Sequence, residues 1–422
     1  MPSASAQAAL AHAGPSDRLT RRAVDVPFKK EGFPLDWGTT TAAYSEEWAM
    51  AQVRRNVLPI GVHLNSDAVY MAQLEQNNKG VRVVSKASCQ LSTSAEMVAR
   101  VVAAGADAGG TDANAEDETA YTQGRQFVRQ KVTTDGFHGR DVVISLPQEH
   151  LVIQHVRMQP MQPAELKAAL PYELEGRLPF SPNDAVVRHI VAGTVSENNE
   201  TKHDVLVLAA PRQVVEKHVS AMTRLGFRVI GVGVEPCAMC YSYAYAATHS
   251  EPSQSGPPCV MVVYLGPRAT HVAILQGQET TFVKGVEQGT DGLVEAVAKV
   301  KGLSLEEAAE LIERWHQSQG PEMLDEAVEV YSRSRSRLDY LVDQVESCVR
   351  YHASLTRGAG VDRLYFVGPG ARDRALVRVL SGRLHLPCEV GDPFGTVTGK
   401  TDSETTEPEM AVAIGLSLFG AQ

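Results

Sequence analysis

The chain has 422 residues, with 40 Lys and Arg against 50 Asp and Glu, and a formal net charge of −10. This balance argues against a general nucleic-acid binder, because attraction to phosphate needs a concentrated basic surface. A chain of this length predicts two or three domains. No apolar run approaches the roughly 20 residues needed to span a bilayer, so the sequence predicts no membrane crossing.

The first 56 residues are the least patterned part of the chain. Ala, Ser and scattered charges occur there without sustained periodicity, which predicts a flexible extension with a short helix near Tyr44 to Val53. The opening MPSASAQAALAHAGPSDRLTRRA lacks the basic start and the uninterrupted apolar core of a secretory signal. We therefore expect the chain to stay in the cytoplasm.

The cysteines are spread along the chain, at positions 89, 237, 240, 259, 348 and 388. They are too sparse for a disulfide framework. Cys237 and Cys240 form a C-x-x-C pair, but the pair lies in the apolar segment PCAMCYSYAYA without a second pair of metal ligands. We expect reduced, buried thiols rather than redox or metal chemistry.

The first strong pattern is a strand–turn–strand unit. Apolar runs within residues 58–74 flank the turn-prone Asn65-Ser66-Asp67, which predicts a β-hairpin, and a third strand follows at 80–91. Residues 105–120 are small and acidic, which predicts a solvated insertion between helices. Further along, the sequence predicts strands at 141–147, 150–158, 186–195, 204–210 and 228–234, and helices at about 162–176, at 212–225 and after Glu235-Pro236.

A second strand–turn–strand unit opens near residue 260. Residues 251–259 have the turn chemistry of a connection, and three short strands follow in VMVVYLGPRATHVAILQGQETTFVKGV. The recurrence of one hairpin design predicts two related lobes. The rest of the chain predicts helices at 291–301, 304–317 and about 323–357, then the strand LYFVG and a final apolar helix.

These elements carry a family resemblance. Two hairpins, a helix opened by Glu-Pro before the second, and a late Gly-rich turn after a strand together resemble the actin/Hsp70/FtsA superfamily. A closer resemblance is to the PilM family of type IV pilus assembly, over about residues 57–420. It is carried, in order and spacing, by ELKAALPYELEGRLPFSPNDAVVRHIV, DVLVLAAPRQVVEKHVSAMTRLGFRVIGVGVEP, VKGVEQGTDGLVEAVAKVKGLSLEEAAEL, VDRLYFVGPGARDRALVRVLSGRLHLPCEVGDPF and EMAVAIGLSL.

The resemblance implies an α/β architecture of the two-lobed, ribonuclease H-like actin/Hsp70 type. Lobe one is expected over residues 57–257 and lobe two over 258–422. A small α+β subdomain, about residues 151–226, is expected as an insertion in lobe one. The extension over residues 1–56 lies outside both lobes.

The resemblance also implies a function. It implies a cytoplasmic scaffold of the pilus inner-membrane platform, peripheral to the membrane, which binds the cytoplasmic tail of a PilN-like membrane protein as a peptide. Two alternatives stay open: an Mg-ATP-binding ATPase or sugar-kinase-like enzyme on the same fold, and a type II secretion component similar to GspL, a family that usually continues into a membrane helix. The sequence leaves homo-oligomerisation open.

The resemblance places a nucleotide site at nine positions of this chain. They are Gly61, His63, Asn65 and Ser66 in the first hairpin, Tyr264 and Gly266 in the second, and Gly289, Gly368 and Gly370 further along. Such a site needs glycine for close backbone approach to phosphate, and carboxylates to organise Mg²⁺.

Several of these positions depart from the family patterns. Against G-x-D-x-G-S, His63 replaces the acid and Asn65 replaces a glycine, while Tyr70 stands where relatives carry Lys. Against D-x-G in the second hairpin, Tyr264 replaces the acid, and Pro267 lacks a backbone N–H. The sequence therefore predicts weak or no binding of ATP and Mg²⁺, no catalytic residues and no metal site, as in a pseudo-ATPase.

The nucleoside side of the expected site is also altered. The helix that usually offers polar contacts reads Ala308-Ala309-Glu310-Leu311-Ile312, with apolar side chains at both polar positions. Only the late turn Gly368-Pro369-Gly370-Ala371 keeps much of the expected shape, and Pro369 intrudes there. This strengthens the prediction of an eroded pocket.

For three further features the sequence leaves alternatives open. Glu235 is expected either to cap the helix that opens at Pro236 or to orient a water molecule. His63 is expected as a hydrogen-bonded interior residue or as an acid/base group or ligand. The PilN peptide is expected in the groove between the small subdomain and lobe one, or on the edge near residues 186–195. Leu178-Pro179-Phe180 is either a packed turn or a partner contact.

Overall fold

The computed structural model describes residues 56–65, 67–77, 80–91, 113–197, 200–249, 257–318, 320–356, 360–399 and 406–419. The predicted extension apart from Asn56, and the helix predicted near Tyr44, lie outside these residues. Ser66, residues 105–112 of the predicted insertion and residues 251–256 of the predicted connection also lie outside them.

The first sheet has the strand order β3-β2-β1-β4-β8. β1 (Ile60–Leu64), β2 (Ala68–Asn77) and β3 (Gly80–Gln90) form an antiparallel meander, and β4 (Asp141–Leu146) and β8 (Arg228–Val234) extend it with parallel pairing. The predicted first hairpin and its neighbouring strands are confirmed, since apolar runs bounded by turn residues favour strands.

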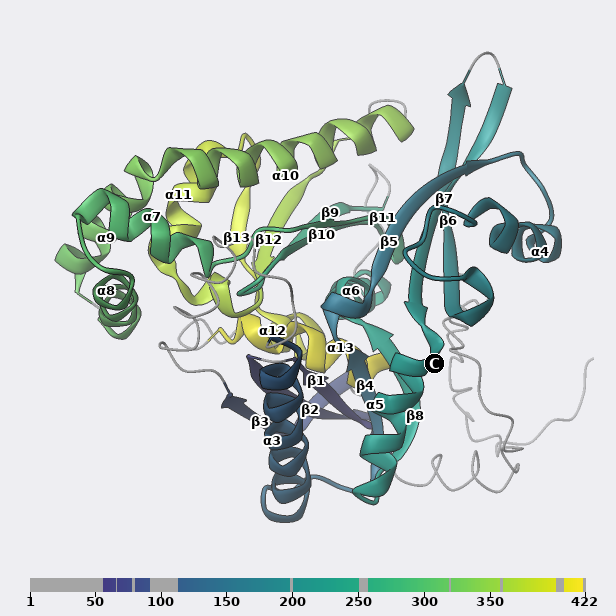
Figure 1. Ribbon diagram of the computed structural model, residues 1–422, viewed down its shortest axis with the longest axis horizontal. Coiled ribbons are helices and arrows are strands. Elements are labelled where there is room, and N and C mark those ends of the chain that lie inside the picture. Colours follow the sequence, from purple (N-terminus) through teal and green to yellow (C-terminus); the bar gives the residue numbers. More distant parts are fainter. Residues whose placement is uncertain are drawn as a thin grey trace, which may run out of the picture. The chain divides into compact units, whose positions relative to one another are not determined.

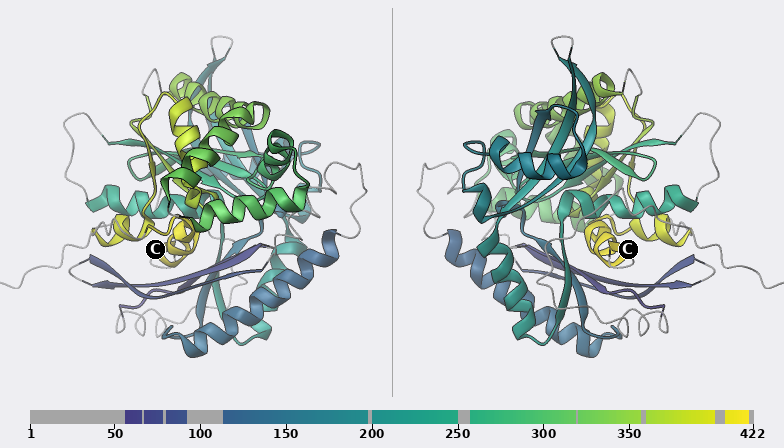
Figure 2. Two further views of the ribbon diagram at one scale, coloured as in Figure 1. Left: turned by 90° about the vertical axis from the view of Figure 1, so that its left-hand side faces the viewer. Right: turned by 90° about the vertical axis from the view of Figure 1, so that its right-hand side faces the viewer.

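Helices cover both faces of this sheet, as Figure 2 shows. α3 (Ala113–Thr134) and α5 (Arg212–Arg224) lie on one face. α13 (Ala411–Phe419) packs against β1, β2 and β4 on the other face, together with α6 (Glu235–His249). The final apolar helix therefore returns to the first sheet. The domain limits expected from the sequence stay a prediction.

The predicted insertion at 105–120 is wrong where the structure describes it, because residues 113–120 form the beginning of α3. Further along this helix, Tyr121 and Val128 are buried against the first sheet. Glu118 is held by Arg125 at 3.1 Å and by Lys217 of α5 at 2.5 Å. Tertiary packing thus extends a helix into a segment whose composition favours solvent.

A small sheet follows, with the order β5-β7-β6. β5 (Val152–Met158), β6 (Ala185–Glu197) and β7 (Glu200–Pro211) pair antiparallel. α4 (Pro163–Glu173) packs on this sheet through Leu166 and Leu170, as seen beside β6 and β7 in Figure 1. The strands and helix predicted for this segment are confirmed.

The second sheet repeats the plan of the first, with the order β11-β10-β9-β12-β13. β9 (Cys259–Leu265), β10 (Thr270–Gln276) and β11 (Glu279–Val286) form an antiparallel meander, and β12 (Arg363–Val367) and β13 (Cys388–Val390) add in parallel. Two sheets of the same topology confirm that the recurring hairpin marks two related halves.

Most helices of the second half pack around one large core with this sheet. They are α7 (Gly292–Lys301), α8 (Leu305–Gln317), α9 (Pro321–Arg333), α10 (Arg335–Leu355) and α11 (Arg374–Arg383). α12 (Pro393–Thr398) lies outside this core and contacts α6, α13 and β3. Short 3₁₀ turns complete the described elements: η1 (Gln148–His150), η2 (Pro182–Asp184), η3 (Pro369–Arg372) and η4 (Pro408–Met410).

The single helix predicted at about 323–357 is wrong. The structure has two helices, α9 and α10, with a break at Ser334, whose backbone ψ is 53°. Its hydroxyl donates to the carbonyl of Val330 at 3.0 Å. Serine competes with the helical backbone in this way, and the surrounding run SRSRSR offers little apolar surface to keep one straight helix packed.

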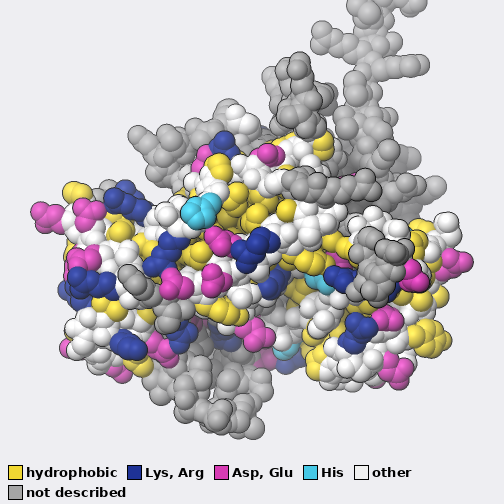
Figure 3. Space-filling model, turned by 90° about the horizontal axis from the view of Figure 1, so that it is seen from above, with side chains coloured by type: hydrophobic (Ala, Val, Ile, Leu, Met, Phe, Trp, Pro, Cys, Tyr) yellow, Lys and Arg dark blue, Asp and Glu magenta, His cyan; other side chains and the backbone are white. Residues whose placement is uncertain are grey.

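Basic and acidic side chains are interspersed on the face drawn in Figure 3. Over the described part of this face, no broad area carries positive charge alone. This distribution agrees with the argument from composition against a general nucleic-acid binder.

Candidate functional site

The turn of the first hairpin is closed by Asn65. Its Oδ1 accepts hydrogen bonds from the backbone N–H groups of Asp67 at 2.9 Å and Ala68 at 2.8 Å. This is the turn-forming role that Asn favours in short connections. Asn65 therefore occupies two N–H groups of the loop that the resemblance assigned to phosphate.

Gly61 serves helix packing. A Cβ atom on it would overlap the carbonyl oxygen of Ala413 and lie 2.6 Å from the amide nitrogen of Ser417, both in α13. The hydroxyl of Ser417 donates to the carbonyl of Pro59 at 2.8 Å. Because Gly61 has no side chain, α13 can lie directly on β1, so this predicted site residue faces a helix.

The turn of the second hairpin packs on the loop before α7. The N–H of Gly266 donates to the carbonyl of Ala269 at 3.1 Å, and the carbonyl of Gly266 accepts from the N–H of Thr290 at 3.0 Å. A Cβ atom on Gly289 would lie 2.5 Å from the backbone carbon of Arg268. Gly266 and Gly289 thus lie in two backbone segments that contact each other.

The two hairpin turns are linked directly. Arg268 Nε of the second turn lies 3.5 Å from Asp67 Oδ2 of the first, and the Asp67 side chain is buried. This ion pair joins the two turns that the resemblance assigned to phosphate. No local pattern in the sequence connects Asp67 with Arg268.

A second link is the cluster of His63, Glu235 and His271. Glu235 Oε2 lies 2.9 Å from His63 Nε2, and its Oε1 lies 2.6 Å from His271 Nδ1. All three side chains are at most 5% exposed. His63 is confirmed as a hydrogen-bonded interior residue, whereas Glu235 does what neither open alternative described, since its carboxylate accepts from two histidines.

The charge of Glu235 is retained in this buried position. Burial by itself would raise the pKa of Glu235, but His271 and His63, through their hydrogen bonds and charge, lower it to about 2. Buried carboxylates are stable as anions only when they are paired and hydrogen-bonded in this way. The carboxylate is therefore ionised and fully engaged at neutral pH.

Tyr264 fills the space beside this cluster. Its ring centroid lies 6.0 Å from that of His63, edge to face, and 6.4 Å from that of His271, stacked. Burial holds the pKa of Tyr264 well above its usual range, with the Glu235 charge as a further cause. At the position where the resemblance implied an acid there is thus a neutral, buried phenol, whose hydroxyl has no hydrogen-bond partner among the described residues.

The late turn contacts the second hairpin. Gly368 has a positive φ of 86°, and a Cβ atom on it would lie 2.9 Å from ring carbons of Tyr264. A Cβ atom on Gly370 would lie 2.8 Å from Leu265 Cβ. Both predicted site glycines therefore permit close packing of η3 on the end of β9.

Several backbone groups of the expected phosphate loops are engaged within the protein. The phosphates of a nucleotide would need free backbone N–H groups, yet those of Asp67, Ala68, Gly266, Thr290 and Gly368 are all bonded within the protein. Prolines at 267 and 369 supply none. Among the described residues there is no group of three or more His, Cys, Asp or Glu side chains that could hold a metal ion.

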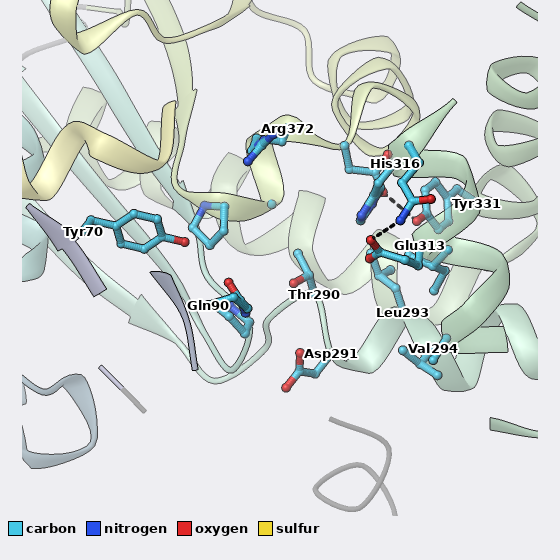
Figure 4. Close-up of a pocket in the computed structure, with 17 residues that line it drawn as sticks. Tyr70, Gln90, Thr290, Asp291, Leu293, Val294, Glu313, His316, Tyr331 and Arg372 are labelled. Carbon is cyan, nitrogen blue, oxygen red and sulfur yellow. Dashed lines mark hydrogen bonds and ion pairs between the residues drawn. The ribbon is translucent and has the colours of Figure 1, made fainter. Parts of the chain in front are cut away.

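An open pocket remains next to this closed region. It has a volume of about 800 Å³ and lies between the first hairpin, η3 and helices α7 and α8. Figure 4 shows Tyr70 and Gln90 on one side, and His316, Glu313 and Tyr331 on the other. Of the predicted site residues that the structure describes, Gly370 alone lines this pocket.

A buried carboxylate organises the far wall of the pocket. Asp373 Oδ2 accepts from Tyr331 at 2.6 Å and lies 3.1 Å from His316 Nε2. Its Oδ1 caps α11 by accepting from the N–H groups of Ala375 and Leu376. Burial alone would raise the pKa of Asp373, but these hydrogen bonds and the His316 charge hold it below its usual range.

This cluster was not predicted from the sequence. An acid directly before an apolar helix is a signal for the cap made by Asp373. No local signal links Asp373 to His316 and Tyr331, which come from α8 and α9. With Asp291 and Glu313 also in the wall, acidic side chains outnumber the basic Arg372, which disfavours an anionic ligand.

Comparison with known families decides the relationship of the chain. The family described as type IV pilus assembly protein PilM matches residues 61–420. The chain belongs to this family. The resemblance drawn from the sequence is therefore confirmed over nearly the range expected for it.

Solved structures support the fold expected of a PilM family member. A structure titled "PilM-PilN type IV pilus biogenesis complex" has a TM-score of 0.62 at 21% identity, covering 87% of this chain and 99% of that chain. The predicted two-lobed actin-like fold is thus confirmed. At this level of identity the likeness concerns the fold alone.

Two more distant structures have lower TM-scores. The ethanolamine utilization protein EutJ from Carboxydothermus hydrogenoformans has 13% identity and a TM-score of 0.45, covering 86% of this chain and 89% of that chain. The cytoplasmic domain of EpsL from Vibrio cholerae has 12% identity and a TM-score of 0.33, covering 86% and 93%. Among the described helices of this PilM family member, none combines the length and apolar character that a membrane span requires.

Proposed function

We propose that this PilM family member is an adaptor of type IV pilus assembly that binds the cytoplasmic tail of a PilN-like membrane protein. The observation that carries the proposal is the family match over residues 61–420. The similar fold in a PilM-PilN complex supports it. Through such a partner the protein would lie at the inner membrane, and none of its described helices could span it.

We further propose that the adaptor works as a pseudo-ATPase. The phosphate side of the expected site contains two ionic links between hairpins and the buried ring of Tyr264. Hydrolysis of ATP needs both a phosphate cradle and an organised Mg²⁺. An active Mg-ATP enzyme is the main alternative, and the experiment below separates the two.

For the peptide, the edge of the small sheet is the acceptor that we propose to test. β6 is an outer strand of this sheet, and Val191 on it is one of three large exposed apolar side chains in the described residues. Edge strands accept extended peptides by adding a strand. A register shift between Val191 and Gly193 interrupts the ladder, so we expect pairing along residues 185–191.

Calorimetric titration tests both parts of the proposal. The purified protein would be titrated with a PilN-tail peptide and, separately, with ATP and Mg²⁺. We expect micromolar binding of the peptide and no heat of binding from ATP. Absence of peptide binding would contradict the adaptor role, and micromolar binding of ATP would contradict the pseudo-ATPase assignment.

Variants provide a test of the β6 edge in the peptide titration and a control in the ATP titration. Val191→Glu should weaken peptide binding at least tenfold, whereas Tyr340→Glu, a similarly exposed apolar position on α10, should leave it unchanged. Equal effects of the two changes would argue against the β6 edge. The double variant Tyr264→Asp, His63→Asp restores both family acids and serves as the gain-of-binding control for ATP.

A further inference from the structure

Glu235 joins the two halves of the molecule through one side chain. His63 lies on β1 of the first sheet, and His271 lies on β10 of the second. Each oxygen of the Glu235 carboxylate takes one of them, at 2.9 Å and 2.6 Å. Glu235 itself begins α6, which contacts β8 of the first sheet and β9, β10 and β11 of the second. The cluster thus spans both sheets.

The geometry of this bridge makes its two halves interdependent. Hydrogen bonds to an ionised carboxylate are stronger than neutral ones, and they strengthen further away from water. If the sheets separated, one histidine would leave the carboxylate partly unpaired in an apolar surrounding, which is strongly unfavourable. The Asp67–Arg268 pair at 3.5 Å spans the two hairpin turns in parallel with it.

We propose that the His63–Glu235–His271 bridge holds the two lobes in one arrangement, as an internal replacement for a bound nucleotide. It lies between the two hairpins to which the family resemblance assigns the phosphates, so it links the same two elements that a nucleotide would link. The lobe arrangement is then a property of the polypeptide alone. This inference concerns lobe geometry and does not depend on the binding of PilN.

The distance between the lobes is the quantity that tests the bridge. Spin labels at Gln130→Cys on α3 and Lys299→Cys on α7, both exposed, report on the first and second lobes. The two partly accessible native thiols would be removed as Cys89→Ser and Cys388→Ser. We expect a narrow distance distribution by pulsed electron resonance, identical with and without ATP and Mg²⁺.

Two variants break the bridge in different ways. Glu235→Ala removes the shared carboxylate, and His63→Phe keeps a ring of similar size but removes one hydrogen bond. We expect the distance distribution to broaden in both, at unchanged helical content by circular dichroism. Asp373→Asn is the matched control, since its carboxylate is also buried and bonded to a His and a Tyr, but within the second lobe alone.

Clear outcomes overturn the proposal. A distribution that stays narrow in both Glu235→Ala and His63→Phe would show that other contacts fix the lobes. If the distance distribution also broadened in Asp373→Asn, the broadening would reflect general destabilisation and not the loss of the bridge. If both bridge variants fail to fold, the spin-labelled protein with an intact bridge still tests the proposal. A shift of its distance distribution on adding ATP and Mg²⁺ would contradict the proposal. Absence of PilN-peptide binding would contradict the adaptor role but not the bridge.

Discussion

The ring of Tyr264 lies against the backbone of Gly368, so that a Cβ atom on this glycine would come within 2.9 Å of ring carbons Cδ2 and Cε2. Tyr264 lies near the end of β9, just before the second hairpin turn, and Gly368 directly follows β12. The contact closes the region between hairpin and late turn with side-chain carbon.

Gly368→Ala should destabilise the protein for two reasons. With a φ of 86° and a ψ of 173°, the backbone of Gly368 lies in a region that is essentially restricted to glycine, which costs a residue with a Cβ about 1–3 kcal/mol. The forced contact with Tyr264 adds about 1–3 kcal/mol. Gly302→Ala is a control for a positive φ without a contact, because Gly302 has a φ of 69° and a ψ of 34° with no atom near the added Cβ. Urea unfolding of both variants measures the difference, and equal losses would argue against a tight Tyr264 contact.

Gly61→Ala should reduce the free energy of unfolding by about 3 kcal/mol or more, since the new methyl group would enter α13. Gly382→Ala on α11 has open space around it and should be neutral or slightly stabilising. The comparison by urea unfolding separates packing from ligand binding. A stable Gly61→Ala protein would return Gly61 to the list of candidate ligand contacts.

Glu235→Ala should cost about 3–5 kcal/mol of folding free energy, because it leaves two buried histidines without their shared partner. The exposed Glu322→Ala on α9 should change the free energy by no more than about 0.5 kcal/mol. A double-mutant cycle with His63→Ala measures the coupling energy directly. Additive losses in that cycle would mean that the two side chains do not interact.

His218 should make stability depend on pH. His218 is a buried residue of α5, and its burial, with the positive charge of His150 and Arg125 nearby, lowers the pKa of His218 from 6.5 to about 4. Between these pH values His218 is protonated in the unfolded chain but neutral in the folded protein. The contribution of His218 to the free energy of unfolding is therefore fully present above about pH 6.5, and it falls by about 3 kcal/mol as the pH drops towards 4.

The variant His218→Gln tests this dependence. It should flatten the stability profile between pH 4 and 6.5, measured as urea midpoints in steps of pH. The exposed His385→Gln should leave the profile as it is in the unmodified protein. An unchanged profile in His218→Gln would assign the acid sensitivity to other groups.

Much of the fold was predictable because it rests on local patterns. The hairpin of β1 and β2 follows from apolar runs around Asn65, and its repetition at β9 and β10 indicated two related halves. Helix α5 was predicted over residues 212–225 because Gly226 stops the helical pattern. The errors, the start of α3 and the break at Ser334, occur where tertiary packing or a side-chain hydrogen bond overrides composition.

For the candidate site, only the departures from the family patterns were predictable. The resemblance marks His63 and Tyr264 as replacements for acids, and this sufficed to predict an eroded phosphate pocket. What replaces the phosphates was not predictable. Glu235 is 172 residues from His63 and 36 from His271 along the chain, so no local pattern connects them.

By itself, the sequence determined the family, the two-lobed architecture and the loss of the two acids, because strand periodicity, turn residues and motif positions are local properties. Only the tertiary structure decided that His63, Glu235 and His271 form one bridge, that Gly61 and Gly368 serve packing, and that Asp373 joins His316 and Tyr331. These depend on which side chains meet across sheets and helices, and folding of the whole chain sets those distances.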